Sequence, residues 1–293
     1  MPCYHPQSGW RDSDGKFTKK ETSHGRLEIA CGGCIGCRID RSRDWAIRCH
    51  HEAQMHEENC FMTLTYDPRH LPKDYSVNLQ HFQIFIRRLR KHTKRPIRFF
   101  HCGEYGDQTQ RPHYHALLFG YDFPDKEIVG KSPNGKYYRY TSDKANRIWT
   151  RGAVELGSVT MESAGYVARY VMKKVNGDKA KEHYTRINPE TGEICEVRPE
   201  YATMSRRPGL GYSWYQRYKN DLYPHDFVIV DGRKYPVPKY YDRLLEKESP
   251  ILMSEIRALR EETYYEINDN TDERLAVKKE VKTHQLNHLS RGL

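Results

Sequence analysis

The sequence contains no long apolar run. Its longest uninterrupted runs, ALLF and FVIV, have four residues each, whereas a membrane-spanning helix needs roughly 20. The first residues, MPCYHPQSGWRDSDGK, also lack the apolar core of a signal peptide. These absences argue against a membrane protein and a secreted one. We therefore expect a cytoplasmic protein whose eight cysteines are mostly reduced.

A nucleotide-binding signature is incomplete, and the sequence has no internal repeat. GKSPNGKY, from Gly130, fits the phosphate-binding pattern G-x₄-G-K, but Tyr137 stands where a Ser or Thr would hold Mg²⁺. The Asn-Gly pair between KSP and KYYRY is typical of a β-hairpin turn instead. We predict a hairpin here rather than a nucleotide site.

The sequence contains fewer acidic than basic residues. The 293 residues include 49 Lys and Arg against 39 Asp and Glu, which gives a net charge of +10 and a pI near 9.1. Such an excess favours a polyanionic partner, and in the absence of a membrane segment nucleic acid is the main candidate. The length suffices for one large or two modest domains with a real core.

Four segments of the chain differ in composition. Residues 1–60 are rich in Cys, His and Arg, and within them the stretch 38–58, free of Gly and Pro, predicts one long charged helix. Residues 61–176 alternate strand and helix patterns. Residues 177–245 are rich in Tyr, Pro and Gly, and residues 246–293 alternate charge signs, which is typical of a solvated helical tail.

The second segment carries five predicted elements. We expect strands at 61–66 (FMTLTY), 97–106 and 113–120, and helices at 78–92 and 160–175. A short polar loop joins the last two strands, so we expect them to pair as a hairpin. The order predicts helices packed on a sheet.

Two histidines alternate in the stretch RPHYHALLFG. Residues i and i+2 of a strand share a face, so His113 and His115 point the same way. Antiparallel pairing with the preceding strand, FFHCGEYG, could bring Glu104 close to both imidazoles. Two imidazoles and a carboxylate form an open site that suits Mg²⁺ or Mn²⁺ better than a closed structural zinc. Alternatively, the histidines simply face solvent and Glu104 is a surface residue in a Gly-flanked turn.

The predicted helix TMESAGYVARYVMKKV has a polar stripe opposite its apolar side. Tyr166, Tyr170 and Lys173 gather on that stripe, where residues four apart are neighbours, and we expect it to be accessible and off the core. A phenol is a competent covalent nucleophile, a divalent ion can polarise a phosphoryl oxygen, and an ammonium can stabilise the charge that builds during transfer. Ordinary amphipathic packing is the alternative.

A cysteine cluster follows the spacing C-x₂-C-x₂-C at Cys31, Cys34 and Cys37. A ferredoxin-type cluster would need a fourth cysteine at position 41, where Arg41 stands. A structural Zn²⁺ remains possible, with reduced thiols as the alternative. The candidates for its fourth ligand are Cys3, Cys49 and His50.

Two basic stretches suit DNA. In SRRPGLGYSWYQRY, cations lie beside aromatic rings, so phosphates could meet charge while bases stack on rings. The candidate DNA-binding residues there are Arg206, Arg207, Tyr212 and Trp214. The alternative is a Gly-rich loop leading into a helix that buries Trp214 and Tyr215. Near the N-terminus, the arginines that could meet DNA phosphates are Arg38, Arg41, Arg43 and Arg48.

Several of these motifs together resemble a known superfamily. The strand FMTLTY, the His-hydrophobic-His strand, and a helix with Tyr-x-x-x-Tyr followed by Lys resemble the three motifs of HUH endonucleases, specifically rolling-circle replication initiators. CGGCIGCRIDRSRDWAIRCHHEA, RPHYHALLFG, YVARYVMKK and MSRRPGLGYSWYQRY resemble the replication initiators of small single-stranded DNA phages, the Microviridae of gokushovirus type. These motifs span roughly residues 31–218.

The resemblance implies an α+β fold, in which a central antiparallel sheet with packed helices forms an RRM-like, ferredoxin-like core between helical N-terminal and C-terminal extensions. His113 and His115 would be metal ligands, with Glu104 as the third, for Mg²⁺ or Mn²⁺. Tyr166 and Tyr170 would be paired nucleophiles. The residues that correspond to the first motif, with a structural and DNA-contacting role, are Thr63, Thr65 and Tyr66.

The resemblance also implies a reaction cycle. One tyrosine would nick the phage origin and hold the 5′ phosphate while the freed 3′ hydroxyl primes a host DNA polymerase, and the second would cut the regenerated origin. Lys173 matches the Tyr-x-x-Lys pattern of single-tyrosine members, which favours Tyr170 as first nucleophile. The partners would be single-stranded and replicative-form phage DNA, a host helicase and a host polymerase, in the bacterial cytoplasm and without a membrane.

Other functions fit parts of the sequence. A non-catalytic RRM-like nucleic-acid binding module would use the same charge and aromatics without chemistry. A metal-dependent hydrolase would use His113, His115 and Glu104 to activate water. An HUH transposase or relaxase would share the tyrosine chemistry.

Overall fold

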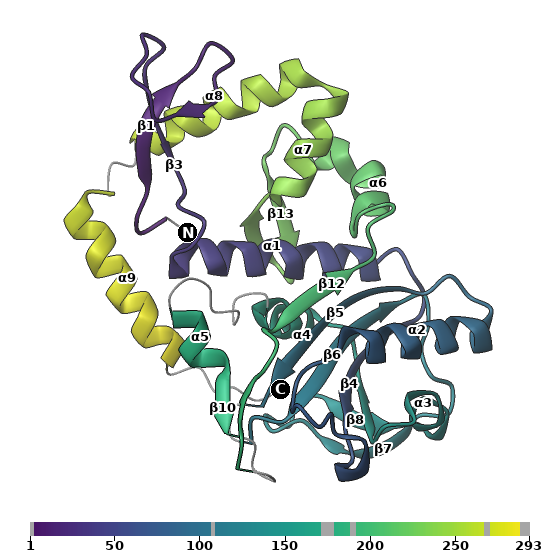
Figure 1. Cartoon of the computed structure of the whole chain (residues 1–293). Helices are drawn as coiled ribbons and strands as arrows, with labels where there is room; N and C mark the ends of the chain where they lie inside the picture. Colours follow the sequence, from purple (N-terminus) through teal and green to yellow (C-terminus); the bar gives the residue numbers. More distant parts are fainter. Residues whose placement is uncertain (1–2, 107–108, 171–178, 188–191, 267–269, 288–293) are drawn as a thin grey trace. The chain divides into compact units, whose positions relative to one another are not determined.

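The computed structural model describes residues 3–106, 109–170, 179–187, 192–266 and 270–287 (Figure 1). The chain forms two compact units. Unit 1 combines residues 1–43 with 242–291, and unit 2 comprises residues 44–241.

Unit 2 is built on a seven-stranded antiparallel sheet with the order β12-β5-β6-β4-β9-β8-β7. The strands are β4 (Asn59–Thr65), β5 (Arg98–Tyr105), β6 (Pro112–Phe119), β7 (Glu127–Lys131), β8 (Tyr138–Thr141), β9 (Val154–Gly157) and β12 (Tyr201–Met204). Side chains alternate between the two faces of such a sheet, and helices cover both faces. The predicted α+β fold with a central antiparallel sheet is therefore confirmed.

One face of the sheet is covered by α2 (Leu79–Thr93) and α3 (Asp143–Trp149). The Asn78 side chain caps α2 by accepting a hydrogen bond from the Gln80 N–H, which satisfies a donor that the first turn leaves open. The apolar residues that recur at helical spacing along α2 are buried against the strands. Its fully or nearly fully buried members are Phe82, Phe85, Ile86 and Leu89.

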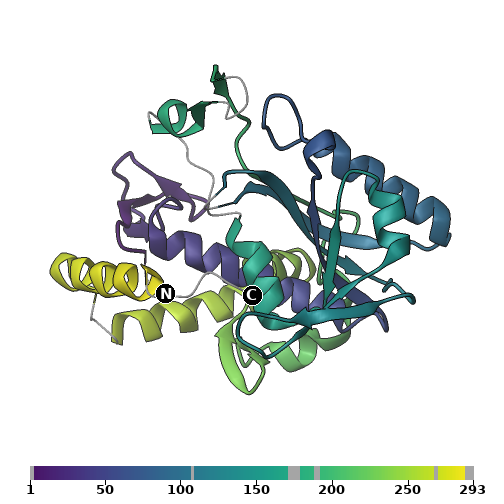
Figure 2. The same ribbon diagram turned by 90° about the horizontal axis from the view of Figure 1, so that it is seen from below.

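The opposite face is covered by α4 (Met161–Arg169) and, from Asp44 onward, by α1 (Ile35–Ala53). A reciprocal capping box between Thr160 and Ser163 begins α4. Figure 2 shows the sheet from below, with α2 on one side and α4 on the other. The buried side chains on this face include Cys102, Leu117, Phe119, Ala164 and Val167.

The predicted strands 61–66, 97–106 and 113–120 and the predicted helix 78–92 lie within two residues of β4, β5, β6 and α2, and the Asn-Gly hairpin is also confirmed. The predicted helix 160–175 begins within one residue of α4, and its last part, residues 171–175, lies outside the described residues. Strands β7 and β8 pair as an antiparallel hairpin whose turn holds Gly135 at φ +70°. The sequence patterns missed α3, β9 and β12. Strand β12 pairs with β5, and there the Tyr201 ring lies so close to Gly103 that a Cβ would be 2.9 Å from it.

The other elements of unit 2 come from the segment without clear periodicity. They are α5 (Lys179–Tyr184), β10 (Thr185–Ile187), β11 (Ile194–Glu196), α6 (Tyr212–Leu222), β13 (Phe227–Val230) and β14 (Arg233–Pro236). A short 3₁₀ turn at Pro68–His70 follows β4. Each strand pair forms its own two-stranded ribbon, β10 with β11 and β13 with β14.

Unit 1 combines a small three-stranded sheet with the C-terminal helices. The sheet contains β1 (Gln7–Arg11), β2 (Phe17–Thr18) and β3 (Arg26–Ile29) in the order β2-β1-β3. Helix α7 (Lys239–Glu248) enters this unit from unit 2, and α8 (Pro250–Glu266) and α9 (Asp272–Asn287) follow, as the charge pattern predicts. Among the described residues, no helix is long and apolar enough to cross a membrane.

Candidate active site

Strands β5 and β6 bring a carboxylate and two imidazoles together. Their register places Glu104 opposite His113 and Cys102 opposite His115. The Glu104 Oε1 atom lies 2.8 Å from Nε2 of His113 and 3.1 Å from Nε2 of His115. The ligand atoms of all three side chains lie within 4.8 Å of one another, so the group could hold a metal ion.

The spacing of these atoms can be compared with metal coordination. Two neighbouring ligands of an octahedral ion with bonds of about 2.1 Å are separated by about 3.0 Å, because their bonds meet at a right angle. The two distances from Glu104 Oε1, 2.8 and 3.1 Å, are close to this value. The Glu104 oxygen and each imidazole nitrogen are therefore close enough together to bind the same ion.

The Nδ1 atom of each imidazole, on the side of the ring away from Glu104, has its own hydrogen-bond partner. Nδ1 of His113 donates a hydrogen bond to the Arg111 carbonyl oxygen at 3.1 Å, because a carbonyl oxygen can only accept. Nδ1 of His115 lies 3.0 Å from the Thr63 hydroxyl on β4. On the other side of each ring, the Nε2–H group donates to the Glu104 carboxylate, which can also only accept. A metal ion bound there would take the place of these two protons, and each imidazole would then keep its proton on Nδ1 and present a lone pair at Nε2. The partners thus orient both Nε2 atoms toward Glu104.

Glu104 is 2% exposed, yet it favours the ionised form. Burial by itself would raise its pKa, but hydrogen bonds and charge interactions with His113 and His115 outweigh burial and hold the pKa well below its usual range. The carboxylate therefore stays negative at neutral pH, which suits a ligand for a divalent cation.

The two tyrosines of the α4 segment pack directly over this group. The Tyr170 ring stacks on the His115 ring at 5.2 Å, and the Tyr166 hydroxyl lies 3.5 Å from His115 Nε2. The two phenol rings meet edge to face at 5.0 Å. Phe61 of β4 adds another ring parallel to His115 at 5.9 Å. The sequence-predicted nucleophiles and metal ligands therefore form one continuous site.

The expectation of an accessible tyrosine stripe is wrong. Tyr170 is only 7% exposed and Tyr166 is half-buried. The reason is that α4 lies against the face of the sheet that carries His115, so its polar side covers the imidazole instead of facing solvent. The helical pattern could not show this because it says nothing of what lies opposite the stripe.

Burial also changes the proton affinity of both phenols. It raises the pKa of Tyr166 to about 12 and raises that of Tyr170 further, with the negative charge of Glu104 adding to the effect on Tyr170. Both hydroxyls are therefore neutral at neutral pH. A cation bound at Glu104 would lower the pKa of both phenols, because it would offset the negative charge of the carboxylate.

A cationic side chain near the tyrosines is Arg169, whose guanidinium lies 5.7 Å from the centre of the Tyr166 ring. The predicted catalytic lysine, Lys173, lies outside the described residues. Thr65 and Tyr66, from the first motif, contact other groups: the Thr65 hydroxyl donates to the Ala153 carbonyl, and Tyr66 is buried in the core of the other face. Sequence reasoning had singled out neither Arg169 nor Phe61.

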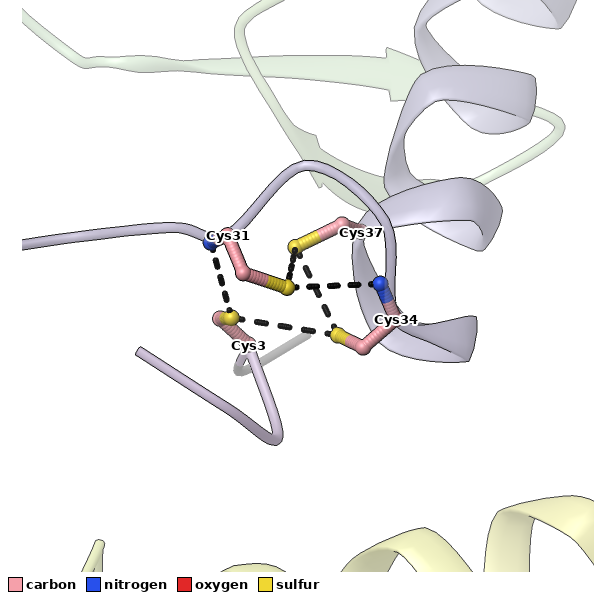
Figure 3. Close-up of side chains that lie close together, drawn as sticks. All are labelled: Cys3, Cys31, Cys34 and Cys37. Atoms are coloured by element: carbon pink, nitrogen blue, oxygen red, sulfur yellow. Dashed lines mark hydrogen bonds between the residues drawn. The ribbon is translucent and has the colours of Figure 1, made fainter. Parts of the chain in front are cut away.

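Unit 1 contains a second group that could hold a metal ion, formed by Cys3, Cys31, Cys34 and Cys37 (Figure 3). Of the three candidates for a fourth ligand, the structure places Cys3 beside the C-x₂-C-x₂-C cysteines. Cys49 is fully buried within unit 2, and His50 faces Gln54 at 3.2 Å.

The predicted DNA-binding residues divide into two kinds. Arg206 and Arg207 are exposed in the turn before α6, and Tyr212 is half-buried at its start. Trp214 stacks on His51 at 3.5 Å and donates from Nε1 to the Gln54 side chain. One face of the Trp214 ring is therefore occupied within the protein.

Arg48 cannot contact DNA phosphates in the way expected for the basic N-terminal stretch. Its guanidinium lies between the rings of Trp45 and Tyr240, about 4 Å from each centre, and it donates to the Leu210 carbonyl. The positive charge is thus committed to packing within unit 2.

The fold and the site together define a mixed α+β protein with a Glu-His-His group and paired tyrosines on one face of an antiparallel sheet. A family model described as Replication-associated protein ORF2/G2P matches residues 59–175, a range that includes all five of these side chains. By this match and those of its relatives, the chain belongs to the family of Microviridae replication-associated proteins.

Three curated relatives extend the match well beyond that range. Replication-associated protein VP4 of Bdellovibrio phage phiMH2K is 33% identical over 263 residues, which cover 85% of this chain and 79% of the relative. Replication-associated protein ORF2 of Spiroplasma virus 4 is 32% identical over 233 residues, which cover 75% of this chain and 68% of the relative. Replication-associated protein ORF4 of Chlamydia phage 1 is 33% identical over 247 residues, which cover 80% of this chain and 57% of the relative. No solved structure matches the chain.

Proposed function

We propose that this protein initiates rolling-circle replication by nicking and rejoining one DNA strand at a phage origin through a covalent 5′-phosphotyrosine intermediate. The observation that carries the proposal is the packing of Tyr166 and Tyr170 over His115, with the Tyr166 hydroxyl 3.5 Å from the Nε2 atom that faces Glu104. The family membership and the net charge of +10 support a role on DNA.

We further propose Mg²⁺ or Mn²⁺ as the ion of the Glu104, His113 and His115 group, on the strength of its mixed oxygen and nitrogen ligands and of the 2.8 and 3.1 Å between the Glu104 oxygen and the two imidazole nitrogens. Glu104, His113 and His115 would hold this ion, which when bound would polarise a phosphoryl oxygen and stabilise negative charge in the transition state. The residues themselves supply the positioning: Thr63 and the Arg111 carbonyl fix the imidazoles, and the imidazole of His115 fixes both phenol rings.

In the proposed reaction a phenolic oxygen attacks the phosphorus of the scissile phosphodiester. The new bond joins tyrosine to the 5′ phosphate and the bond to the 3′ oxygen breaks. The phenol loses its proton to solvent, and the departing 3′ oxygen takes up a proton to become a 3′ hydroxyl. The phosphodiester energy is conserved, so a 3′ hydroxyl can later attack the same phosphorus and release the tyrosine. Two tyrosines allow a second cut while the first link still exists.

The remaining parts of the chain take supporting roles in this proposal. Residues 61–176 carry the chemistry, with Lys173 as a further candidate for charge stabilisation. Arg206, Arg207 and Tyr212 contact the phosphates and bases of the origin. The strand opening and extension require a host helicase and a host polymerase, in the cytoplasm of the infected bacterium.

Covalent capture tests the proposal. The protein is incubated with Mn²⁺ and labelled single-stranded DNA from the origin of its own genome, and protein–DNA adducts that survive denaturation are counted for the wild type, Tyr166→Phe, Tyr170→Phe and the double variant. We expect the double variant to form no adduct. Tyr138→Phe, at a tyrosine that is 48% exposed on β8, is the matched control and should react like the wild type.

The alternatives give different results. Cleavage that persists in the double variant would mean that water is the nucleophile, as in a metal-dependent hydrolase. Binding without cleavage by any version, with several divalent metals tried, would leave only a nucleic-acid binding module. Either result would overturn the proposal.

A further inference from the structure

We propose that Cys3, Cys31, Cys34 and Cys37 bind one structural zinc ion that stabilises unit 1. This inference does not depend on the proposed nuclease activity, because all four cysteines lie in unit 1 whereas the Glu-His-His group and both tyrosines lie in unit 2.

The separations of the sulfur atoms match a single tetrahedral ion. In a tetrahedral site with Zn–S bonds of about 2.3 Å, neighbouring sulfurs are about 3.8 Å apart. The Sγ atoms of Cys3 and Cys34 are 3.8 Å apart, those of Cys31 and Cys37 4.0 Å, and those of Cys34 and Cys37 3.6 Å. These values far exceed the roughly 2.05 Å of a disulfide bond. Figure 3 shows the four side chains converging on one point.

Backbone N–H groups point at three of the sulfurs. The Cys31 N–H donates to the Cys3 sulfur at 3.2 Å, the Cys34 N–H donates to the Cys31 sulfur at 3.3 Å, and the Tyr4 N–H donates to the Cys34 sulfur at 3.4 Å. Such donors stabilise negative charge on sulfur, which is the form that binds a metal. They are the surroundings that an anionic thiolate site needs.

Local structure explains how residues 28 positions apart come to one place. Strand β1 pairs with β3 from Gln7 opposite Ile29, so the chain before β1 and the chain after β3 leave the sheet at the same end. Cys3 and Cys31 lie on these two ends. Gly32, at φ +73°, then turns the chain toward Cys34, and Arg41 holds the turn by donating to the Gly32 carbonyl.

Four thiolates give a closed site, which is typical of structural rather than catalytic zinc. A tetrahedral sulfur site selects zinc or iron among the common metals. In an iron–sulfur cluster the four thiolates are divided among two or more iron atoms, and thiolates on different irons stand farther apart than ligands of one ion. All four sulfurs here lie within 4.8 Å of one another, which disfavours a cluster. A single ion with four sulfurs remains.

Unit 1 also has little else to stabilise its sheet. In β1, β2 and β3 the only buried residue is Gly9, which has no side chain to contribute to a core. The buried apolar side chains described in unit 1 are Tyr4, Leu245, Met253, Ile256 and Leu275. Small sheets with so little buried area usually need a metal or disulfide. Metal binding would supply that folding free energy.

Metal analysis tests the inference. The full chain is produced in medium containing both zinc and iron, purified without added metal or chelator, and its metal content is measured by mass spectrometry. We expect close to one zinc ion per chain, and loss of that zinc in the Cys31→Ser/Cys37→Ser double variant. Cys195→Ser, which changes a half-exposed cysteine of unit 2, is the matched control and should retain zinc.

A second set of variants separates this site from the proposed active centre. The His113→Ala/His115→Ala variant should lose adduct formation but keep its zinc. Cobalt substituted into the wild type should give the thiolate charge-transfer and tetrahedral absorption bands of a sulfur site. Limited proteolysis after zinc removal should cut first within residues 3–43.

Three outcomes would overturn the inference. They are a wild-type protein that is folded but free of zinc, a chain that carries iron instead, and a zinc ion that is lost with His113 and His115 but kept without Cys31 and Cys37. If the double cysteine variant does not fold, the cobalt spectrum of the wild type still decides the ligand set.

Discussion

Thr63 contacts the imidazole on which the whole site is centred. Its hydroxyl lies 3.0 Å from His115 Nδ1, while His115 Nε2 faces Glu104 and the ring of His115 stacks with Tyr170. One hydroxyl on β4 therefore influences both a candidate metal ligand and a candidate nucleophile. Thr63 acts through His115, so it is a positioning residue.

Replacing Thr63 by Val should lower the rate of adduct formation about 10- to 100-fold, as is usual for residues that orient metal ligands. Because the ring orientation is lost, we also expect a higher Mn²⁺ concentration at half-maximal rate. Kinetics over a range of Mn²⁺ concentrations measure both effects. Thr63→Ser should restore activity. Thr141→Val is the control, because the Thr141 hydroxyl on β8 accepts a hydrogen bond from the Asn146 side chain and does not contact the imidazoles. Equal rates for Thr63→Val and the wild type would contradict the assignment.

Among the elements, α1 depends on one buried carboxylate. Glu52 of α1 is 3% exposed; it accepts a hydrogen bond at 2.7 Å from the Gly211 N–H, just before α6, and it pairs with Arg98 of β5. Burial alone would raise the pKa of Glu52, but hydrogen bonds from His56, the Gly211 N–H and Arg98 outweigh it and lower the pKa. A single ionised side chain thus joins three elements of unit 2.

Glu52→Gln should destabilise unit 2 by about 2 kcal/mol at neutral pH, because hydrogen bonds to a buried charged group are lost. The pKa of Glu52 is lower in the folded state, so its stabilisation is present above the ordinary value of 4.5 and is lost as the pH falls through the folded-state pKa. Urea unfolding between pH 7 and pH 3 should show the two proteins converging in acid. Glu57 is exposed, so Glu57→Gln is the control and should unfold at the same urea concentration as the wild type at every pH. A loss of stability in Glu52→Gln that does not change with pH would contradict the mechanism.

At the scale of the whole molecule, the net charge bears on DNA binding and the division into two units bears on stability. The net charge of +10 predicts salt-sensitive DNA binding, and Arg206 and Arg207 are exposed residues that can contribute to it. The two units differ in what stabilises them: unit 2 has an extensive apolar core on both faces of its sheet, and unit 1 has few buried apolar side chains among those described.

Arg206→Ala and Arg207→Ala should each weaken binding of single-stranded DNA by a similar factor for all sequences. If each arginine contacts one phosphate, the slope of log affinity against log salt should fall by about 0.7 per substitution. Fluorescence anisotropy at several salt concentrations measures the slope. Lys16→Ala makes the same charge change at a residue whose side chain is 75% exposed in unit 1 and serves as the control. An unchanged slope would remove the two arginines from the DNA-binding surface.

Local pattern was a good guide wherever neighbours in the chain decide the structure. The β5–β6 pairing follows from two strands and a short loop, and a period of two then places Glu104, His113 and His115 on one face. The hydrophobic period of α2 likewise predicts the face that is buried. These features need no knowledge of distant residues.

Features set within short stretches differ from features set by contacts between distant parts of the chain. The strand pairing, the Glu-His-His set and the C-x₂-C-x₂-C spacing all arise within short stretches, so the sequence alone determined them. Only the tertiary structure decided that Tyr170 is buried against His115, that Cys3 rather than Cys49 joins the other cysteines, and that Arg48 packs between two rings. The physical reason is that burial and the choice of partner are set by which surfaces meet, and a periodic pattern specifies a face but not its neighbour.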